Sequence, residues 1–71
     1  MRNNQRLAFT DDELTLMMLY NPGTRKGLLR ELRKMQTQLS AKDKELRGWT
    51  LSVLAKLQAM SDEEFDQLEL L

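Results

Sequence analysis

Apolar residues recur along the chain in four groups, and each group has helical spacing or follows a helix-start signal. In the first group, nearly every position from Leu14 to Tyr20 is apolar. A helix that is apolar on all sides is normally covered on all sides. This helix, predicted at 11–20, is therefore expected either to lie in the centre of the molecule or to have one side covered by a partner.

A second helix, predicted at 24–39, is amphipathic. At 100° per residue, four of its apolar residues share one narrow stripe, with Leu29 at the edge. These four are Leu28, Leu32, Met35 and Leu39. The opposite side is basic and carries Lys26, Arg30, Arg33 and Lys34. Such a side is usually a solvated surface, but it also suits contact with phosphates or with an acidic protein.

The third helix, predicted at 41–59, has a core side and a side of small residues. The core side is formed by Leu46, Trp49, Thr50, Val53, Leu54, Leu57 and Met60. The candidate helix-packing face consists of Gly48, Ser52, Ala55 and Ala59, with Leu51 at its edge. Small residues on a wet surface are ordinary, but they also let another helix approach closely. A second contact face, used for self-association, is the alternative interpretation.

Two segments, 9–14 and 60–65, have almost the same pattern: apolar, hydroxyl, Asp, acid, Glu, apolar. In each, a hydroxyl residue is followed three positions later by Glu, which is a capping box. The flanking apolar pair is the matching hydrophobic staple. The capping pairs are Thr10 with Glu13, and Ser61 with Glu64. They predict the start of the helix at 11–20 and of a short last helix at 62–67.

Two short connectors separate the three main helices. Residues 21–24, Asn-Pro-Gly-Thr, favour a tight turn, because Pro and Gly both disfavour continued helix. Thr24 is placed to cap the second helix. A single Gly, without a following Gly-Lys-Ser/Thr, is a weak match to a phosphate-binding loop. In the next connector, Ser40 is expected to cap the third helix, with Asp43 as the weaker partner of a capping box.

These elements predict an all-α fold. It is a small bundle of three main helices, at about 11–20, 24–39 and 41–59, with a short C-terminal helix at 62–67. Residues 1–6 are expected to form a polar tail and residues 7–71 a single helical domain, which is the usual organisation for a chain of this length.

The sequence contains no His and no Cys. Disulfides, zinc sites of thiolate or imidazole and the usual nucleophile–base pairs are therefore excluded. The acids at 11–13 and 62–64 already serve as helix-start charges. We expect no catalytic site, no cofactor and no bound metal.

Charge is unevenly distributed, although the formal net charge is zero. Residues 24–47 hold eight Lys or Arg and three acids, a net +5, while residues 61–71 hold five acids and no base, a net −5. The acidic end can fold back on the basic middle, or each can attract its own partner. No segment approaches the roughly 20 apolar residues of a membrane span. We expect a cytoplasmic protein that does not enter a membrane.

Three segments, in this order and spacing, resemble the transposon-transfer assisting protein family. They are the opening segment at 9–14, the turn Tyr20-Asn21-Pro22-Gly23-Thr24-Arg25 and the closing segment from Lys56 to Leu68. Asn-Pro stands here where the family more commonly has Asp-Thr, which should stiffen the turn. The second helix is also more basic than the family pattern. The residues that match the family motifs, all in structural roles, are Thr10, Glu13, Tyr20, Gly23, Thr24, Arg25, Ser61, Asp62, Glu64 and Phe65.

The resemblance implies an all-helical, non-enzymatic accessory protein of a bacterial conjugative transposon. It implies assistance of transfer through protein–protein interaction. The expected partner is another protein encoded on the same mobile element, and a second copy of the chain, as a homodimer, is also open. The alternative is a DNA-binding accessory or regulator that uses the basic side of the helix at 24–39. The resemblance supplies no catalytic or ligand-binding residues.

Overall fold

Four helices account for most of the chain in a computed structural model, which describes residues 8–68. They are α1 (Asp11–Tyr20), α2 (Arg25–Gln36), α3 (Lys44–Ala59) and α4 (Asp62–Asp66). The described residues contain no strand. The predicted all-α class, with three main helices and a short fourth one, is confirmed. The predicted polar tail at 1–6 lies outside the described residues.

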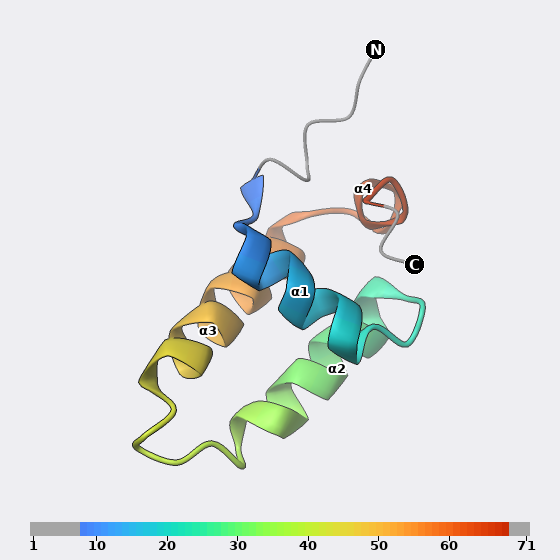
Figure 1. Cartoon of the computed structure of the whole chain (residues 1–71). Coiled ribbons are helices and arrows are strands. Elements are labelled where there is room, and N and C mark those ends of the chain that lie inside the picture. Colours follow the sequence, from blue (N-terminus) through green and yellow to red (C-terminus); the bar gives the residue numbers. More distant parts are fainter. Residues whose placement is uncertain (1–7, 69–71) are drawn as a thin grey trace.

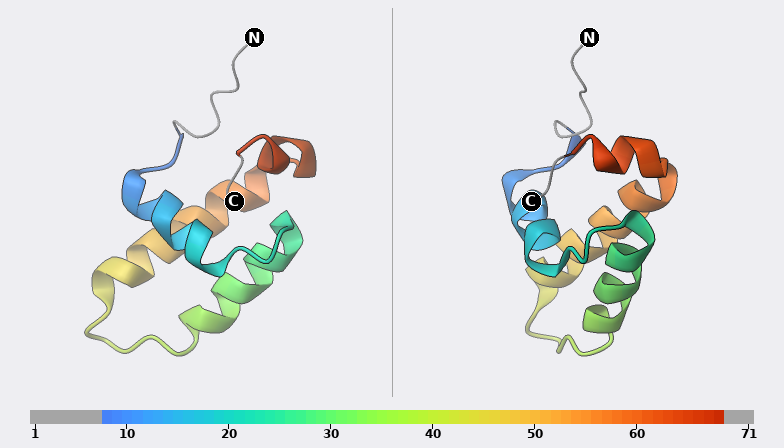
Figure 2. Two further views of the ribbon diagram at one scale, coloured as in Figure 1. Left: turned by 45° about the vertical axis from the view of Figure 1, so that its right-hand side comes forward. Right: turned by 90° about the vertical axis from the view of Figure 1, so that its right-hand side faces the viewer.

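Helices α2 and α3 lie side by side and run in opposite directions, and α1 crosses one face of this pair (Figure 1). Two further views also show α1 on this same face of the α2–α3 pair (Figure 2). Helix α4 lies across the end where α2 begins and α3 ends (Figure 2). The other face of the α2–α3 pair is not covered by any of the four described helices.

Both predicted capping boxes are present. At the start of α1, the Thr10 hydroxyl accepts from the Glu13 N–H at 3.1 Å, and the Glu13 carboxylate accepts from the Thr10 N–H at 2.8 Å. At the start of α4, Ser61 and Glu64 make the same two bonds at 3.1 and 2.8 Å. Phe9 is buried beside the first box, and so are Met60 and Phe65 at the second, as hydrophobic staples require.

The turn between α1 and α2 has the predicted form. The Asn21 side-chain oxygen accepts from the Gly23 N–H at 2.9 Å. Gly23 has a φ of +112°, which L side chains rarely adopt, so glycine is required here. The Thr24 hydroxyl caps α2 by accepting from the Gly27 N–H at 3.0 Å. A Cβ at Gly27 would come within 2.7 Å of both Pro22 Cγ and Thr24 Oγ1, so this glycine allows the turn to close on the helix.

The connector between α2 and α3 is longer than predicted. Helix α2 ends at Gln36 instead of 39, and α3 begins at Lys44 instead of 41. The prediction that Ser40 caps α3 is therefore wrong. Its hydroxyl instead accepts from the Lys42 N–H at 3.2 Å, and its own N–H donates to the Asp43 carboxylate at 3.0 Å. These local bonds stabilise a turn that competes with helix.

Apolar side chains from all four helices meet in one core. Its buried members are Phe9, Leu16, Met17, Leu28, Leu29, Leu32, Val53, Leu54, Leu57, Met60, Phe65 and Leu68. Thr50 is also fully buried and satisfies its hydroxyl by donating to the Leu46 carbonyl at 2.8 Å. Met35, Leu46 and Trp49, predicted to belong to the core, lie only partly buried at its margin. Leu39, predicted in the apolar stripe of the second helix, lies beyond the end of α2 and is only partly buried. The other predicted core residues of α2 and α3 are buried.

Candidate functional site

Helix α1 leaves part of its apolar surface open. Leu16 and Met17 are buried, while Met18 and Leu19, which we call the α1 patch, are exposed by 46% and 75%. The helix packs on α2 and α3 through one side only, so a sequence that is apolar all round cannot be covered completely. Of the two alternatives predicted for this helix, complete burial is not seen within residues 8–68, where one side of α1 stays exposed.

The small-residue side of α3 is largely exposed, as predicted. Gly48, Leu51, Ala55 and Ala59 are open, and Leu51 is exposed by 50%. A Cβ built at Gly48 would meet nothing within 4 Å, so none of the four described helices packs against that glycine. Ser52 differs, because it is partly buried and hydrogen-bonds Glu13 of α1. The predicted face is thus divided: Ser52 belongs to the α1–α3 contact.

Glu13 has a role that the sequence alone did not reveal. It is only 3% exposed, and its carboxylate lies 2.7 Å from the Lys56 ammonium. The ammonium also lies 5.2 Å from the centre of the Phe9 ring, within cation–π range. Burial raises the pKa of the Glu13 carboxyl, but hydrogen bonds from Lys56, Ser52 and Thr10 outweigh it and lower the pKa overall.

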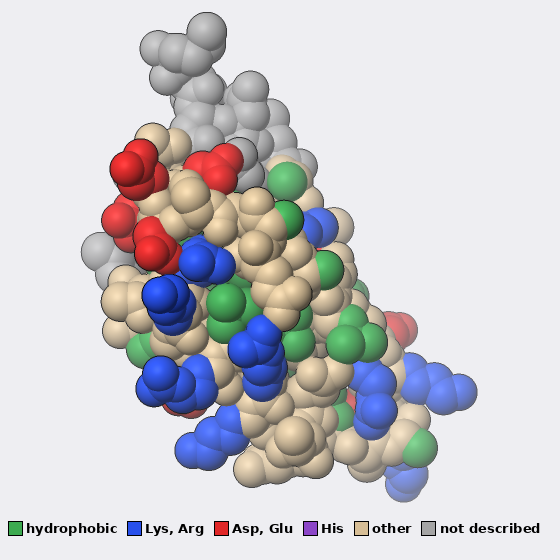
Figure 3. Space-filling view, turned by 180° about the vertical axis from the view of Figure 1, so that it is seen from behind, with side chains coloured by type: hydrophobic (Ala, Val, Ile, Leu, Met, Phe, Trp, Pro, Cys, Tyr) green, Lys and Arg blue, Asp and Glu red, His purple; other side chains and the backbone are tan. Residues whose placement is uncertain are grey.

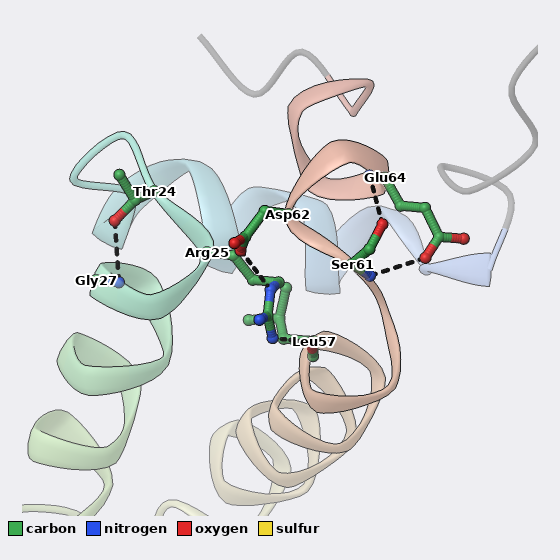
Figure 4. Close-up of polar contacts among 7 residues, drawn as sticks. All are labelled: Thr24, Arg25, Gly27, Leu57, Ser61, Asp62 and Glu64. Atoms are coloured by element: carbon green, nitrogen blue, oxygen red, sulfur yellow. Dashed lines mark hydrogen bonds and ion pairs between the residues drawn. The ribbon is translucent and has the colours of Figure 1, made fainter.

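The predicted turn and the predicted closing segment meet through Arg25. Its Nε lies 2.8 Å from the Asp62 carboxylate, and its Nη1 donates to the Leu57 carbonyl at 2.9 Å (Figure 4). The Arg25 side chain is only 15% exposed. Part of the acidic C-terminal region therefore does fold back on the basic middle of the chain. This contact joins two of the three segments that carry the family resemblance.

The basic side of α2 remains open to solvent. Lys26, Arg30, Arg33 and Lys34 are all exposed, and no ion pair between described residues involves any of them. Figure 3, which views the molecule from the side opposite to Figure 1, shows Lys and Arg side chains over α2 and over the start of α3. Acidic side chains gather instead at the α4 end of that view.

The remaining residues predicted to match the family motifs have structural positions. Tyr20 is partly buried at the end of α1, Phe65 is buried in the core and Thr24 is the N-cap of α2. Among residues 8–68, no group of three or more acids could hold a metal ion. None of the helices described is long and apolar enough to cross a membrane.

The described residues form a small helical bundle. Capping boxes begin α1 and α4, and an ion pair joins the start of α2 to α4. The family model described as "Putative transposon-transfer assisting protein" matches residues 9–71. The chain belongs to this family, and the resemblance predicted from its three segments is confirmed. Neither a curated protein nor a solved structure matches the chain significantly.

Proposed function

We propose that this chain is a non-enzymatic accessory protein of a bacterial conjugative transposon. It assists transfer in the cytoplasm by binding another protein that the same element encodes. Membership of a family named for assisting transposon transfer supports the role, since assistance implies a component that is assisted. The structural argument for protein binding rests on the α1 patch.

The two adjacent apolar side chains of the α1 patch carry the proposal. Single exposed apolar residues are normal on a protein surface, but Met18 and Leu19 stand together on a helix whose other side forms the core. Exposed apolar groups of this kind mark interaction sites. Met also adapts its shape to a partner because its side chain is unbranched and flexible.

The exposed side of α3 offers a second contact area. Leu51 supplies an apolar anchor, and Gly48 and Ala55 on the same helix are exposed and small. A partner helix can approach Gly48 and Ala55 closely, because neither carries a long side chain. Leu51 therefore provides a second position at which partner binding can be tested.

The chemistry of the chain supports a non-enzymatic role. The sequence has no His and no Cys for the usual nucleophile–base pairs. Glu13 is a buried carboxylate, but its oxygens accept from Lys56 and from the Thr10 N–H. A carboxylate held in this way stabilises the fold and is poorly placed to exchange protons with a substrate.

The test is a binding titration against each purified protein encoded on the same element, with light scattering to give the mass of each complex. We expect one partner to bind, and Met18→Ser combined with Leu19→Ser to weaken binding by about tenfold or more. The melting temperature should stay unchanged, because both side chains are exposed. The matched control is Arg30→Gln with Arg33→Gln, which leaves the α1 patch intact and should bind normally.

Two outcomes would overturn the proposal. If the chain stays monomeric and binds none of the element's proteins, it has no protein partner of the kind proposed. If it forms a dimer that the α1 substitutions dissociate, the α1 patch binds a second copy instead. If Leu51→Ser abolishes binding and the α1 substitutions do not, the partner contacts α3 instead of α1. That result would also overturn the assignment to the α1 patch.

A further inference from the structure

We infer that the side of the α2–α3 pair opposite α1 binds the phosphate backbone of duplex nucleic acid without reading its base sequence. The observation is a continuous basic segment of chain. Residues 26–47 expose seven cations, which we call the basic face: Lys26, Arg30, Arg33, Lys34, Lys42, Lys44 and Arg47. The same segment holds three acids, of which Glu45 is exposed and Glu31 and Asp43 are partly exposed, so seven cations and three acids leave a net +4. The net charge of this surface is therefore strongly positive.

Three cations on α2 form a row suited to phosphates. Lys26, Arg30 and Arg33 are spaced by four and three residues, which places them on one side of a helix. At 1.5 Å per residue the row is about 10 Å long. Duplex DNA presents one phosphate about every 3.4 Å of axis on each strand, so the row can reach several phosphates.

These cations are available for a ligand, whereas Arg25 is not. No ion pair within residues 8–68 involves the three cations of the row. Arg25, one residue before Lys26, is held by Asp62 and by the Leu57 carbonyl. Arg25 is therefore part of the fold and lies outside the basic face.

The connector and the start of α3 extend the basic face. Lys42 lies in the connector, and Lys44 and Arg47 lie in the first turn of α3, so all three follow the end of α2. Figure 1 shows the connector at that end of the α2–α3 pair. The Arg47 Nη2 donates to the carbonyls of Leu39 and Ser40 at 3.2 and 3.3 Å. These bonds fix the position of the Arg47 guanidinium while the side chain stays exposed.

The composition of the basic face favours nucleic acid over an acidic protein. The anchors of protein–protein interfaces are Trp, Tyr and Arg side chains that are buried in well-packed, desolvated pockets. Helix α2 has Arg, but it exposes no large apolar side chain to pack around it. Phosphate contacts need only cations and polar groups. Single strands are normally held by stacking of bases on exposed aromatics, and the described aromatics Phe9, Tyr20, Trp49 and Phe65 are all buried or partly buried. A duplex backbone fits this surface best.

The acidic end orients the molecule on such a ligand. Asp62, Glu63 and Asp66 are exposed at α4, at the opposite end of α2 from the connector. Asp62 is paired with Arg25, but Glu63 and Asp66 repel phosphates and direct α4 away from the duplex. Lys26 lines a pocket with Asp62 and Asp66 and is therefore the end of the row nearest to these acids. Helix α1 lies on the other side of the pair, so its patch stays open to a protein (Figure 2). The inference goes beyond the proposed protein binding, and either can fail while the other holds.

The experiment measures anisotropy of a fluorescent duplex of about 20 base pairs, titrated with the full chain between about 50 and 300 mM salt. With about four to six phosphates contacted, we expect log K to fall with log salt at a slope of about −4 to −5. Two duplexes of unrelated sequence should bind equally, because the bases are not read.

Two matched variants distinguish the effect of the basic face on binding from the effect of the overall net charge. Arg30→Gln with Arg33→Gln removes two positive charges and should weaken binding at about 50 mM salt by about tenfold or more, with a slope smaller by about 2. The control, Gln58→Glu with Gln67→Glu, makes the same change in net charge at exposed positions outside the basic face. It should bind within about twofold of the unsubstituted chain. Circular dichroism confirms that both variants are folded.

Three results would overturn the inference. The first is no binding at about 50 mM salt. The second is an equal loss in both variants, which would mean that net charge alone governs binding. The third is tighter binding of poly-L-glutamate than of duplex at the same concentration of charge. That result would reassign the basic face to an acidic protein.

Discussion

The two capping boxes have the same local geometry but different surroundings. The bonds in the Thr10–Glu13 box and in the Ser61–Glu64 box have the same lengths, 3.1 and 2.8 Å. Glu13, however, is only 3% exposed and pairs with Lys56, whereas Glu64 is partly exposed. The second box is attached to the bundle by its neighbour Asp62, which pairs with Arg25.

Different interactions determine where a helix begins and where it packs in the bundle. A capping box satisfies backbone N–H groups at a helix start wherever that helix lies. The position of α1 also depends on the Glu13–Lys56 pair to α3, and that of α4 on the Arg25–Asp62 pair to α2. Substitutions that remove only a local capping bond should therefore lower the stability of the two boxes equally. Substitutions that also remove a tertiary ion pair should lower it by different amounts.

The largest difference is expected between the two glutamates. Glu13→Ala removes a buried carboxylate and leaves Lys56 without its partner, so the free energy of unfolding should fall by about 2–3 kcal/mol. This lies below the full value for a buried pair, because the Lys56 side chain is 33% exposed and can reach water. Glu64→Ala should cost less, about 1 kcal/mol, because the Glu64 side chain is partly exposed and water can replace part of what it loses. Urea denaturation followed by circular dichroism measures both, and equal losses would contradict the comparison.

Removal of the Arg25 side chain is expected to have the next largest effect. Arg25→Ala breaks the bonds to Asp62 and to the Leu57 carbonyl, and should cost about 1–2 kcal/mol. Arg30→Ala, on the same helix but exposed, is the control and should stay within about 0.5 kcal/mol of the unsubstituted chain. Hydrogen exchange should show faster exchange of α4 amides in Arg25→Ala alone. Similar stability in the two variants would show that α4 is held by apolar contacts.

The capping hydroxyls should behave alike. Thr10→Ala and Ser61→Ala each remove one hydrogen bond to a backbone N–H, and each should cost about 1 kcal/mol. The two losses are expected to agree within about 0.5 kcal/mol, since neither hydroxyl makes a tertiary contact among the described residues. Thermal and urea unfolding of both variants measure this. A clear difference would mean that the boxes are already unequal at the local level.

The smallest effect is a pH dependence that comes from Glu13. Its pKa is lowered in the folded state, because the hydrogen bonds from Lys56, Ser52 and Thr10 outweigh the effect of burial. The unfolded state therefore binds more protons in the interval between the folded and unfolded pKa values, and stability rises with pH there. This contribution is complete above the unfolded value of about 4.3 and is lost as pH falls through the folded pKa.

The variant Glu13→Gln isolates this contribution. Near pH 6, the free energy of unfolding of this variant should be furthest below that of the unsubstituted chain. The difference in free energy should become smaller as the pH is lowered to about 3.5. Urea midpoints at several pH values measure the gap. A constant gap would show that the ionised form of Glu13 is not favoured by the fold.

Much of the fold could be predicted from local chemistry, and the errors have a common cause. Capping at Thr10, Thr24 and Ser61 was predicted because each cap bonds within three residues of itself. Ser40 has the same local pattern as the other caps, but its hydroxyl bonds Lys42 and Asp43 instead. The competing turn is also local, and the pattern alone could not choose between the two.

The candidate surfaces could also be predicted only in part. Helical spacing predicted the exposed row of Lys26, Arg30 and Arg33, because periodicity specifies which residues share a side. It could not determine which side of a helix that is apolar all round stays open, and Met18 and Leu19 emerged only from the packing of α1. Nor did it separate Ser52, which contacts Glu13, from Ala55, which is exposed.

The sequence by itself determined the four helices, the caps of α1, α2 and α4, the glycine turn and the family, since these depend on residues close together in the chain. Tertiary structure alone decided that Glu13 pairs with Lys56, 43 residues away, and Arg25 with Asp62, 37 residues away. It also decided which apolar side chains remain exposed. The physical reason is that ion pairs and burial depend on how helices pack, and a local pattern specifies a helix but not its neighbours.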